Sequence, residues 1–149
     1  MKRQHRTVGA VLQVPVSDGM CSYALTLPEA DFAFFGPPFR EPMKDLRELL
    51  SLPMLFRAAV HKFAWSQGRW LKIGKITVPE GLLAPRPMFI QHSNGLHQIY
   101  LGGSITKASR EQCEGLERAV VWDPHHIEER LNARFKGVPC RWEALYRLK

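Results

Sequence analysis

Apolar residues in the first part of the chain fall into short segments with a β-type pattern, separated by turn residues. Residues 8–16 are apolar and rich in valine, and residues 20–27 resume after the turn Ser17-Asp18-Gly19, so the pattern predicts a hairpin. A third short strand is predicted at residues 31–35. We expect Gly36-Pro37-Pro38 to end it, because proline cannot donate to a strand ladder.

The same alternation predicts further strands toward the C-terminus. Residues 54–63 have the pattern of a buried strand, and residues 70–78 are apolar on both faces, which favours a central position in a sheet. The turn Ser93-Asn94-Gly95 predicts a hairpin between two short apolar segments. The last predicted strands, including those of this hairpin, are at residues 88–90, 98–101, 116–122 and 141–148.

Helices are predicted at few places. Residues 44–50 carry leucines at helical spacing, and Ser109 opens a capping box for a single turn. Asp123-Pro124 is a typical helix start, and Gly137 a typical end. Residues 79–87 hold three prolines and are predicted to form a loop. About eight short strands and two or three short helices predict one α+β domain over residues 1–149, with a mainly antiparallel sheet.

Length and cysteine content place this domain in a broad class. A chain of 149 residues suits a single domain, and no run of about 18 apolar residues predicts a membrane span. The apolar run near the N-terminus is interrupted by Gln13 and Pro15, which is not the pattern of a signal peptide. The three cysteines are widely spaced, so we expect reduced thiols in a cytoplasmic protein without a membrane partner.

The chain is basic, with 21 Lys and Arg residues against 14 Asp and Glu residues and a formal net charge of +7. Residues 1–75 hold 11 of these basic groups and only 6 of the acidic ones. Such an excess favours an acidic partner, either a nucleic acid or an acidic protein, and does not choose between them. The candidate partner contacts are basic residues of the first half, namely Arg40, Lys44, Arg47 and Arg69.

No pattern in the sequence specifies a reaction. The nucleophile elbow and the phosphate-binding loop are both missing, and adjacent His125 and His126 would point to different faces of a helix. We therefore assign no catalytic, cofactor-binding or metal-binding residue and expect no enzyme and no cofactor. Trp65 and Trp70 flank Arg69 in the arrangement of a nucleic-acid stacking platform, but core packing is the commoner use of tryptophan.

The order of several short motifs resembles one known family. The chain is similar to the immunity protein 26 family of bacterial polymorphic-toxin systems over roughly residues 8–135. The motifs that carry the resemblance are Gly9-x-Val11, Val14-Pro15-Val16-x-Asp18-Gly19, Tyr23-Ala24, Trp70-x-x-Ile73-Gly74-x-Ile76, Pro87-x-Phe89, Cys113-Glu114-Gly115-Leu116-Glu117 and Val121-Trp122-x-Pro124-x-x-Ile127-Glu128-x-Arg130-Leu131. The resemblance implies a small cytoplasmic α+β protein that binds and neutralises a toxin encoded beside it, and it transfers no catalytic residue.

The expected function is therefore occlusion of an acidic or locally acidic toxin domain, and the alternative is a basic nucleic-acid-binding module. The signature residues Trp70, Gly74, Glu117, Trp122 and Arg130 are expected to serve structure. We predict an ion pair between Glu117 and Arg130 that joins a helix to a sheet. We also predict that Trp70 is buried and that Gly74 marks a bulge or a close neighbour.

Overall fold

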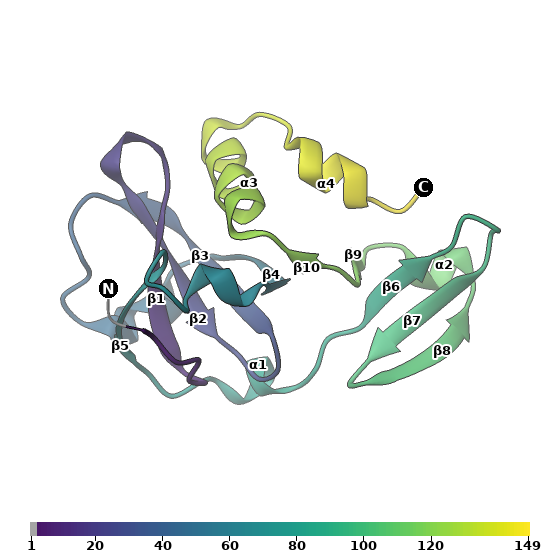
Figure 1. Ribbon diagram of the computed structural model, residues 1–149, viewed down its shortest axis with the longest axis horizontal. Helices are drawn as coiled ribbons and strands as arrows, with labels where there is room; N and C mark the ends of the chain where they lie inside the picture. The colour runs from purple at the N-terminus through teal and green to yellow at the C-terminus, as the bar shows by residue number, and fades with distance from the viewer. Residues whose placement is uncertain (1–2) are drawn as a thin grey trace.

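The computed structural model describes residues 3–149 and places two β-sheets side by side (Figure 1). The strands of the larger sheet are β1 (Ala10–Pro15), β2 (Cys21–Thr26), β3 (Asp31–Phe39), β4 (Met54–Val60), β5 (Leu71–Lys75) and β10 (Val121–Trp122). Those of the smaller sheet are β6 (Met88–Gln91), β7 (His97–Leu101), β8 (Ser104–Ala108) and β9 (Glu117–Arg118). The α-helices are α1 (Glu80–Leu83), α2 (Arg110–Cys113), α3 (Pro124–Lys136) and α4 (Arg141–Tyr146), and the 3-10 helices are η1 (Ser17–Gly19), η2 (Leu46–Ser51) and η3 (Lys62–Ala64).

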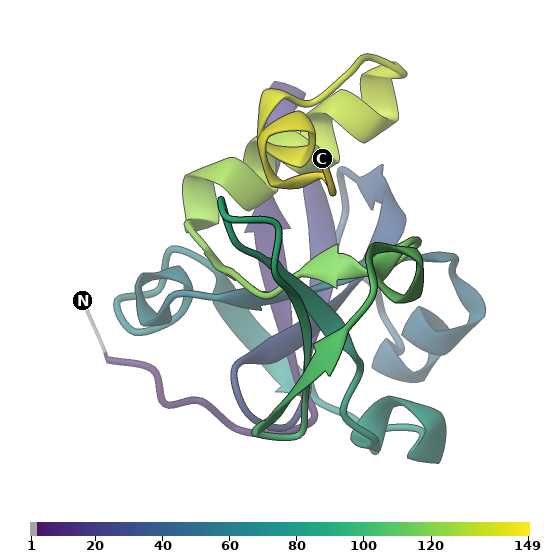
Figure 2. The same cartoon turned by 90° about the vertical axis from the view of Figure 1, so that its right-hand side faces the viewer.

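The spatial order is β10-β4-β3-β2-β1-β5 in the larger sheet and β8-β7-β6-β9 in the smaller one. Only the pairs β10–β4 and β6–β9 are parallel in the described chain. The predicted α+β fold with mainly antiparallel pairing is confirmed. The segment from β9 to β10 links the two sheets, and both views place α3 and α4 on the same side of it (Figures 1 and 2).

Local signals of the sequence account for several elements. Asp123 accepts a hydrogen bond from the backbone N–H of His125 at 2.8 Å and begins α3, and Gly137 ends this helix with a φ of +68°. The capping box at Ser109 is formed, with Gln112 as its partner. The predicted helix at residues 44–50 is present as the 3-10 helix η2, which begins at the cap Asp45.

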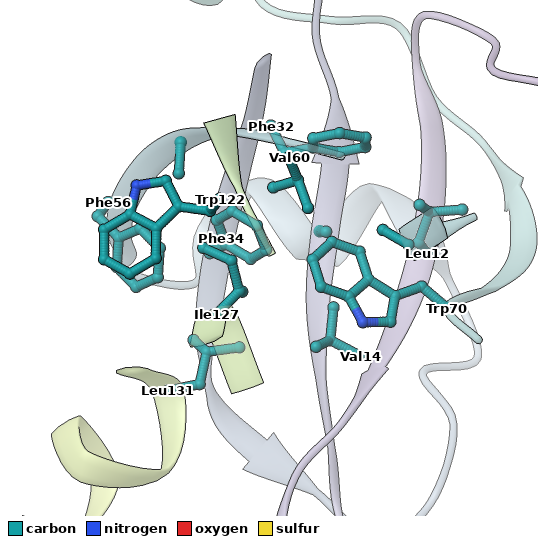
Figure 3. Close-up of a cluster of buried hydrophobic side chains, with 13 residues drawn as sticks. Leu12, Val14, Phe32, Phe34, Phe56, Val60, Trp70, Trp122, Ile127 and Leu131 are labelled. Carbon is teal, nitrogen blue, oxygen red and sulfur yellow. The ribbon is translucent and has the colours of Figure 1, made fainter. Parts of the chain in front are cut away.

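The larger sheet is buried on both faces. One face carries the Trp70 core, which α3 covers (Figure 3) and whose largest members are Phe32, Phe34, Phe56, Trp70, Trp122, Ile127 and Leu131. The other face carries the Tyr23 core, which includes Val11, Tyr23, Leu25, Leu27, Ala33, Phe35, Leu49, Ile76 and Val78. Consecutive residues of a strand point to opposite faces, so both parities of β1 to β3 must be apolar.

Two predictions about the larger sheet are wrong. Strand β3 does not stop at Gly36-Pro37-Pro38 but runs on to Phe39, because the pairing with β2 shifts register there and resumes as Cys21 opposite Phe39. Strand β5 is not central. It pairs only with β1 and forms one edge of the sheet, and its Leu71 is exposed.

Four more differences lie in the second half of the chain. Residues 141–148 do not form a strand, since residues 141–146 form α4, in which Trp142 and Tyr146 share one face at i, i+4 spacing. The strand predicted at residues 116–122 is divided into β9 and β10, which pair in different sheets. The sequence prediction omits β8 after the turn Gly102-Gly103, and it omits the short helix α1.

Gly74 has the close neighbour that was predicted for it, and it lies at an irregularity of the β1–β5 pairing. A Cβ atom at this position would lie 2.3 Å from Cδ1 of Leu46. We therefore expect Gly74→Ala to lower the free energy of unfolding by about 1 kcal/mol, because the leucine must move. Gly81→Ala is the control, since a Cβ there meets nothing within 4 Å, and it should stabilise by about 0.5 kcal/mol. Urea unfolding measures both, and equal effects would contradict the close contact.

Candidate functional site

A cleft of about 490 Å³ lies between the two sheets. Its lining comes from the turn between β2 and β3, from β4 and β10, from residues 83–86 at the end of α1 and in the loop after it, and from β6 and β7. Volumes of this size are typical of ligand-binding pockets. The cleft is therefore the first candidate for a functional site.

One wall of the cleft belongs to the larger sheet. Phe56 of β4 points into the Trp70 core, so its neighbour Arg57 and the next alternate residue, Ala59, point toward the other face. Val121 of β10 is paired with Ala59 and extends the same wall. The Tyr23 core thus continues into the cleft at the β10 edge of the sheet.

The smaller sheet supplies the opposite wall. Met88 and Ile90 lie two residues apart in β6 and share one face, and Tyr100 of β7 is paired with Met88 on the same face. All three side chains line the cleft and are half-buried. Because the facing residues Ala59 and Val121 are also apolar, most of the cleft offers apolar surface.

A buried ionic cluster lies at one side of this apolar cleft. Asp31 forms ion pairs with Arg57 and with Arg86, and both N–O distances are 2.9 Å. The three side chains keep only 14–15% of their surface exposed. One carboxylate thus balances two guanidinium groups, and Nη1 of Arg86 is buried without a hydrogen-bond partner among the described residues.

Arg6 supplies a third guanidinium group, which binds the backbone of the turn between β2 and β3. Arg6 donates through Nη2 to two backbone carbonyl oxygens, one of which belongs to Asp31 at 2.8 Å. Burial lowers the pKa of Arg6, while the charge of Asp31 acts in the opposite direction. Glu29, which adopts a left-handed conformation with a φ of +63°, adds a negative charge at the rim. Arg6 does not line the cleft, and the charged residues that do, Glu29, Asp31, Arg57 and Arg86, carry a net charge of zero.

The basic residues proposed from the sequence do not line this cleft. Arg40, Lys44 and Arg47 are exposed in the stretch from the end of β3 to η2. Arg40 donates to the backbone oxygen of Asp18 at 3.0 Å, and Arg47 pairs with Asp45 at 3.0 Å. These three residues stay candidates for a rim that attracts an acidic partner.

Arg69 is held elsewhere, against α3. Its Nε and Nη2 atoms donate to the two carboxylate oxygens of Glu128, each at 2.8 Å. This hydrogen bonding raises the pKa of Arg69. Glu128 also accepts from Nε1 of the buried Trp70 at 3.0 Å, so Arg69 belongs to a bridge between η3, α3 and the Trp70 core. The four basic candidates therefore do not form one cluster.

Three of the signature residues, Glu117, Trp122 and Arg130, lie where α3 meets the segment from β9 to β10. Arg130 pairs with Glu117 at 2.7 Å, as predicted, and also with Glu143 of α4 at 2.9 Å. The guanidinium carbon of Arg130 lies 3.7 Å from the ring centroid of Phe56 and 5.0 Å from that of Trp122. Trp70 is fully buried, as predicted, so it offers no stacking surface.

Further findings describe the chain as a whole. Within residues 3–149, no three His, Cys, Asp or Glu side chains are grouped so that they could hold a metal ion. No helix of this part of the chain has the length and apolar character needed to span a membrane. Comparisons of the chain with family models, with curated proteins and with solved structures gave no match.

Sequence reasoning missed the ionic cluster of Asp31, Arg57 and Arg86 in the cleft. Asp31, Arg57 and Arg86 are far apart in the chain, and only the pairing of β3 with β4 and the path of residues 83–86 bring them together. One signal was present, because Arg57 interrupts the otherwise apolar strand Met54–Val60. A lone arginine within an apolar strand indicates a buried charge that needs a partner.

Proposed function

We propose that the chain is a non-catalytic binding protein of the immunity type, which neutralises a bacterial toxin by occluding it. The observation that supports this most is the cleft between the sheets, because it combines apolar walls with the cluster of Asp31, Arg57 and Arg86. The resemblance of the sequence motifs to the immunity protein 26 family supports the same proposal. The net charge of +7 supports an acidic partner.

The chemistry of the cleft specifies the segment that would enter it. Apolar walls favour a partner segment with an aliphatic or aromatic side chain, whose burial supplies most of the binding free energy. A carboxylate beside that side chain would accept charge-assisted hydrogen bonds from Arg57 or Arg86, whose Nη1 has no partner among the described residues. We therefore propose that an acidic loop of the toxin occupies the cleft, while the exposed basic residues Arg40, Lys44 and Arg47 speed up the encounter.

The decisive test is co-expression with the toxin encoded beside the gene, followed by measurement of survival and of binding by calorimetry. Val121→Glu places a negative charge on the cleft wall, where Val121 is 55% exposed. It should weaken binding at least about tenfold, because a like charge meets the acidic segment. Ile105→Glu is the matched control, since Ile105 of β8 is 54% exposed and lies outside the cleft.

The possible outcomes distinguish an error in the proposed function from an error in the proposed binding site. If the wild-type chain neither protects cells nor binds the toxin, the immunity function is wrong. If it protects and binds but Val121→Glu and Ile105→Glu bind equally well, the function stands and the cleft is not the interface. Protection that Val121→Glu alone abolishes supports both parts of the proposal.

A further inference from the structure

Phe63 is the most exposed aromatic side chain among the large apolar residues of the described chain, with 58% of its surface accessible. It lies in the middle of η3, where the next residue, Ala64, is fully buried and anchors the turn. The ring of His61 stacks on that of Phe63, with centroids 5.4 Å apart and planes inclined by 7°. The exposed ring of Phe63, with the parallel ring of His61 stacked against it, forms an accessible aromatic platform.

Phe63 lines two neighbouring hollows, and at least one basic side chain lines each of them. Arg3 and Lys62 line the first hollow together with Phe63. Arg69 and His125 line the second one, again together with Phe63. We call these five residues and His61 the Phe63 surface.

Gln4 fixes the N-terminal segment against this surface. Its backbone N–H donates to the carbonyl oxygen of Ser66, and its side-chain amide donates to the carbonyl oxygens of Trp65 and Trp70, both at 2.8 Å. The side-chain oxygen of Gln4 accepts from the backbone N–H of Lys72 at 3.0 Å. These bonds hold Arg3 beside η3 and bring Lys72 to the same N-terminal segment.

The charge of this region is positive. Arg3, Lys62, Arg69 and Lys72 contribute four positive charges, and the acidic residues near them are Asp123 and Glu128. Glu128 is already bound by Arg69, and Asp123 accepts from the backbone at the start of α3. Asp123 is exposed and lines the second hollow, so the excess positive charge lies on the side of Arg3 and Lys62.

We propose that the Phe63 surface binds single-stranded nucleic acid, with a base stacked on Phe63 and the flanking phosphates beside Arg3 and Lys62. An exposed ring with the cations Arg3 and Lys62 beside it is the arrangement that such strands use, since every base has a flat face and every linkage a negative charge. An acidic peptide would use the cations but not the ring, so the platform favours nucleic acid. This activity is independent of the cleft between the sheets and goes beyond the proposed toxin binding.

The test is fluorescence anisotropy with labelled strands of about 12 nucleotides, namely oligouridine, oligothymidine and an abasic strand of equal charge. Phe63→Ala should weaken binding of the strands with bases about tenfold and leave the abasic strand unaffected. Lys62→Gln should weaken all strands and reduce the slope of log K against log salt by about 0.7, the value for one phosphate contact. Ile105→Ala and Lys107→Gln, both in exposed positions of β8, are the matched controls and should change nothing.

Three results would overturn the proposal. The first is no binding of any strand at low salt. The second is binding that Phe63→Ala leaves unchanged, because the base then does not stack on this ring. The third is equal or tighter binding of a polyglutamate peptide with the same loss in Lys62→Gln, which would assign the surface to an acidic protein. Circular dichroism of Phe63→Ala checks that the loss is not one of folding.

Discussion

Replacing Arg130 with alanine should lower the free energy of unfolding by about 3 kcal/mol. Arg130 is 6% exposed, and it bridges Glu117 and Glu143 while its guanidinium group lies over the ring of Phe56. The variant loses both ion pairs and the cation–π contact and leaves a cavity beside the Trp70 core. It also leaves two carboxylates without their shared cation. Denaturant unfolding followed by circular dichroism measures the loss.

Replacing Glu117 should lower the free energy of unfolding less than replacing Arg130. The side chain of Glu117 is 40% exposed, and Arg130 keeps Glu143 when Glu117 is removed. We therefore expect Glu117→Gln to cost about 1 kcal/mol, well below the cost of breaking a fully buried pair. Arg141→Ala, whose pair with Glu129 is exposed, is the control and should cost less than about 0.5 kcal/mol. A loss in Arg130→Ala as small as that of Arg141→Ala would contradict this role.

The elements that the sequence predicted well are those with local signals. The helix α3 is bounded by a cap at Asp123 and a left-handed residue at Gly137, and both act within a single turn. The hairpin of β1 and β2 follows from Ser17-Asp18-Gly19, where Asp18 and Gly19 have positive φ values. Such signals depend only on neighbouring residues, so a single sequence contains them.

The elements that it predicted badly depend on distant contacts. The alternation in residues 141–148 fits a strand, but Trp142 stacks on His126 of α3 and Tyr146 contacts Trp122, and these contacts favour a helix. The apolar pattern of β5 does not reveal that its outer edge lacks a partner strand. Tertiary packing decides which strands pair and which of them lie at the edge of a sheet, and it overrides local patterns.

The candidate sites differ from the sequence prediction for the same reason. Tryptophan beside arginine left a stacking platform at Trp65 and Trp70 as the alternative to core packing. Trp70 fills the core, as predicted, and the exposed ring belongs to Phe63. The alternation of residues 54–63 predicts a strand that ends at Phe63, but this residue lies in η3, and alternation alone does not distinguish a buried ring from an exposed one. Predicting the cleft requires the register of β3 with β4 and the position of Arg86, and neither follows from composition or motifs.

Trp70→Ala should lower the free energy of unfolding by about 4 kcal/mol, which for a marginally stable domain removes much of its stability. The indole is fully buried, lies in edge-to-face contact with the rings of Phe32 and Phe34 at 6.1 and 5.7 Å, and donates to Glu128. Trp70→Phe keeps part of the packing but loses this hydrogen bond, so we expect a loss of about 2 kcal/mol. Phe63→Ala removes an exposed ring of the same segment and should stay within about 0.5 kcal/mol of the wild type. Thermal and urea unfolding measure all three, and wild-type stability in Trp70→Ala would contradict a core built around this indole.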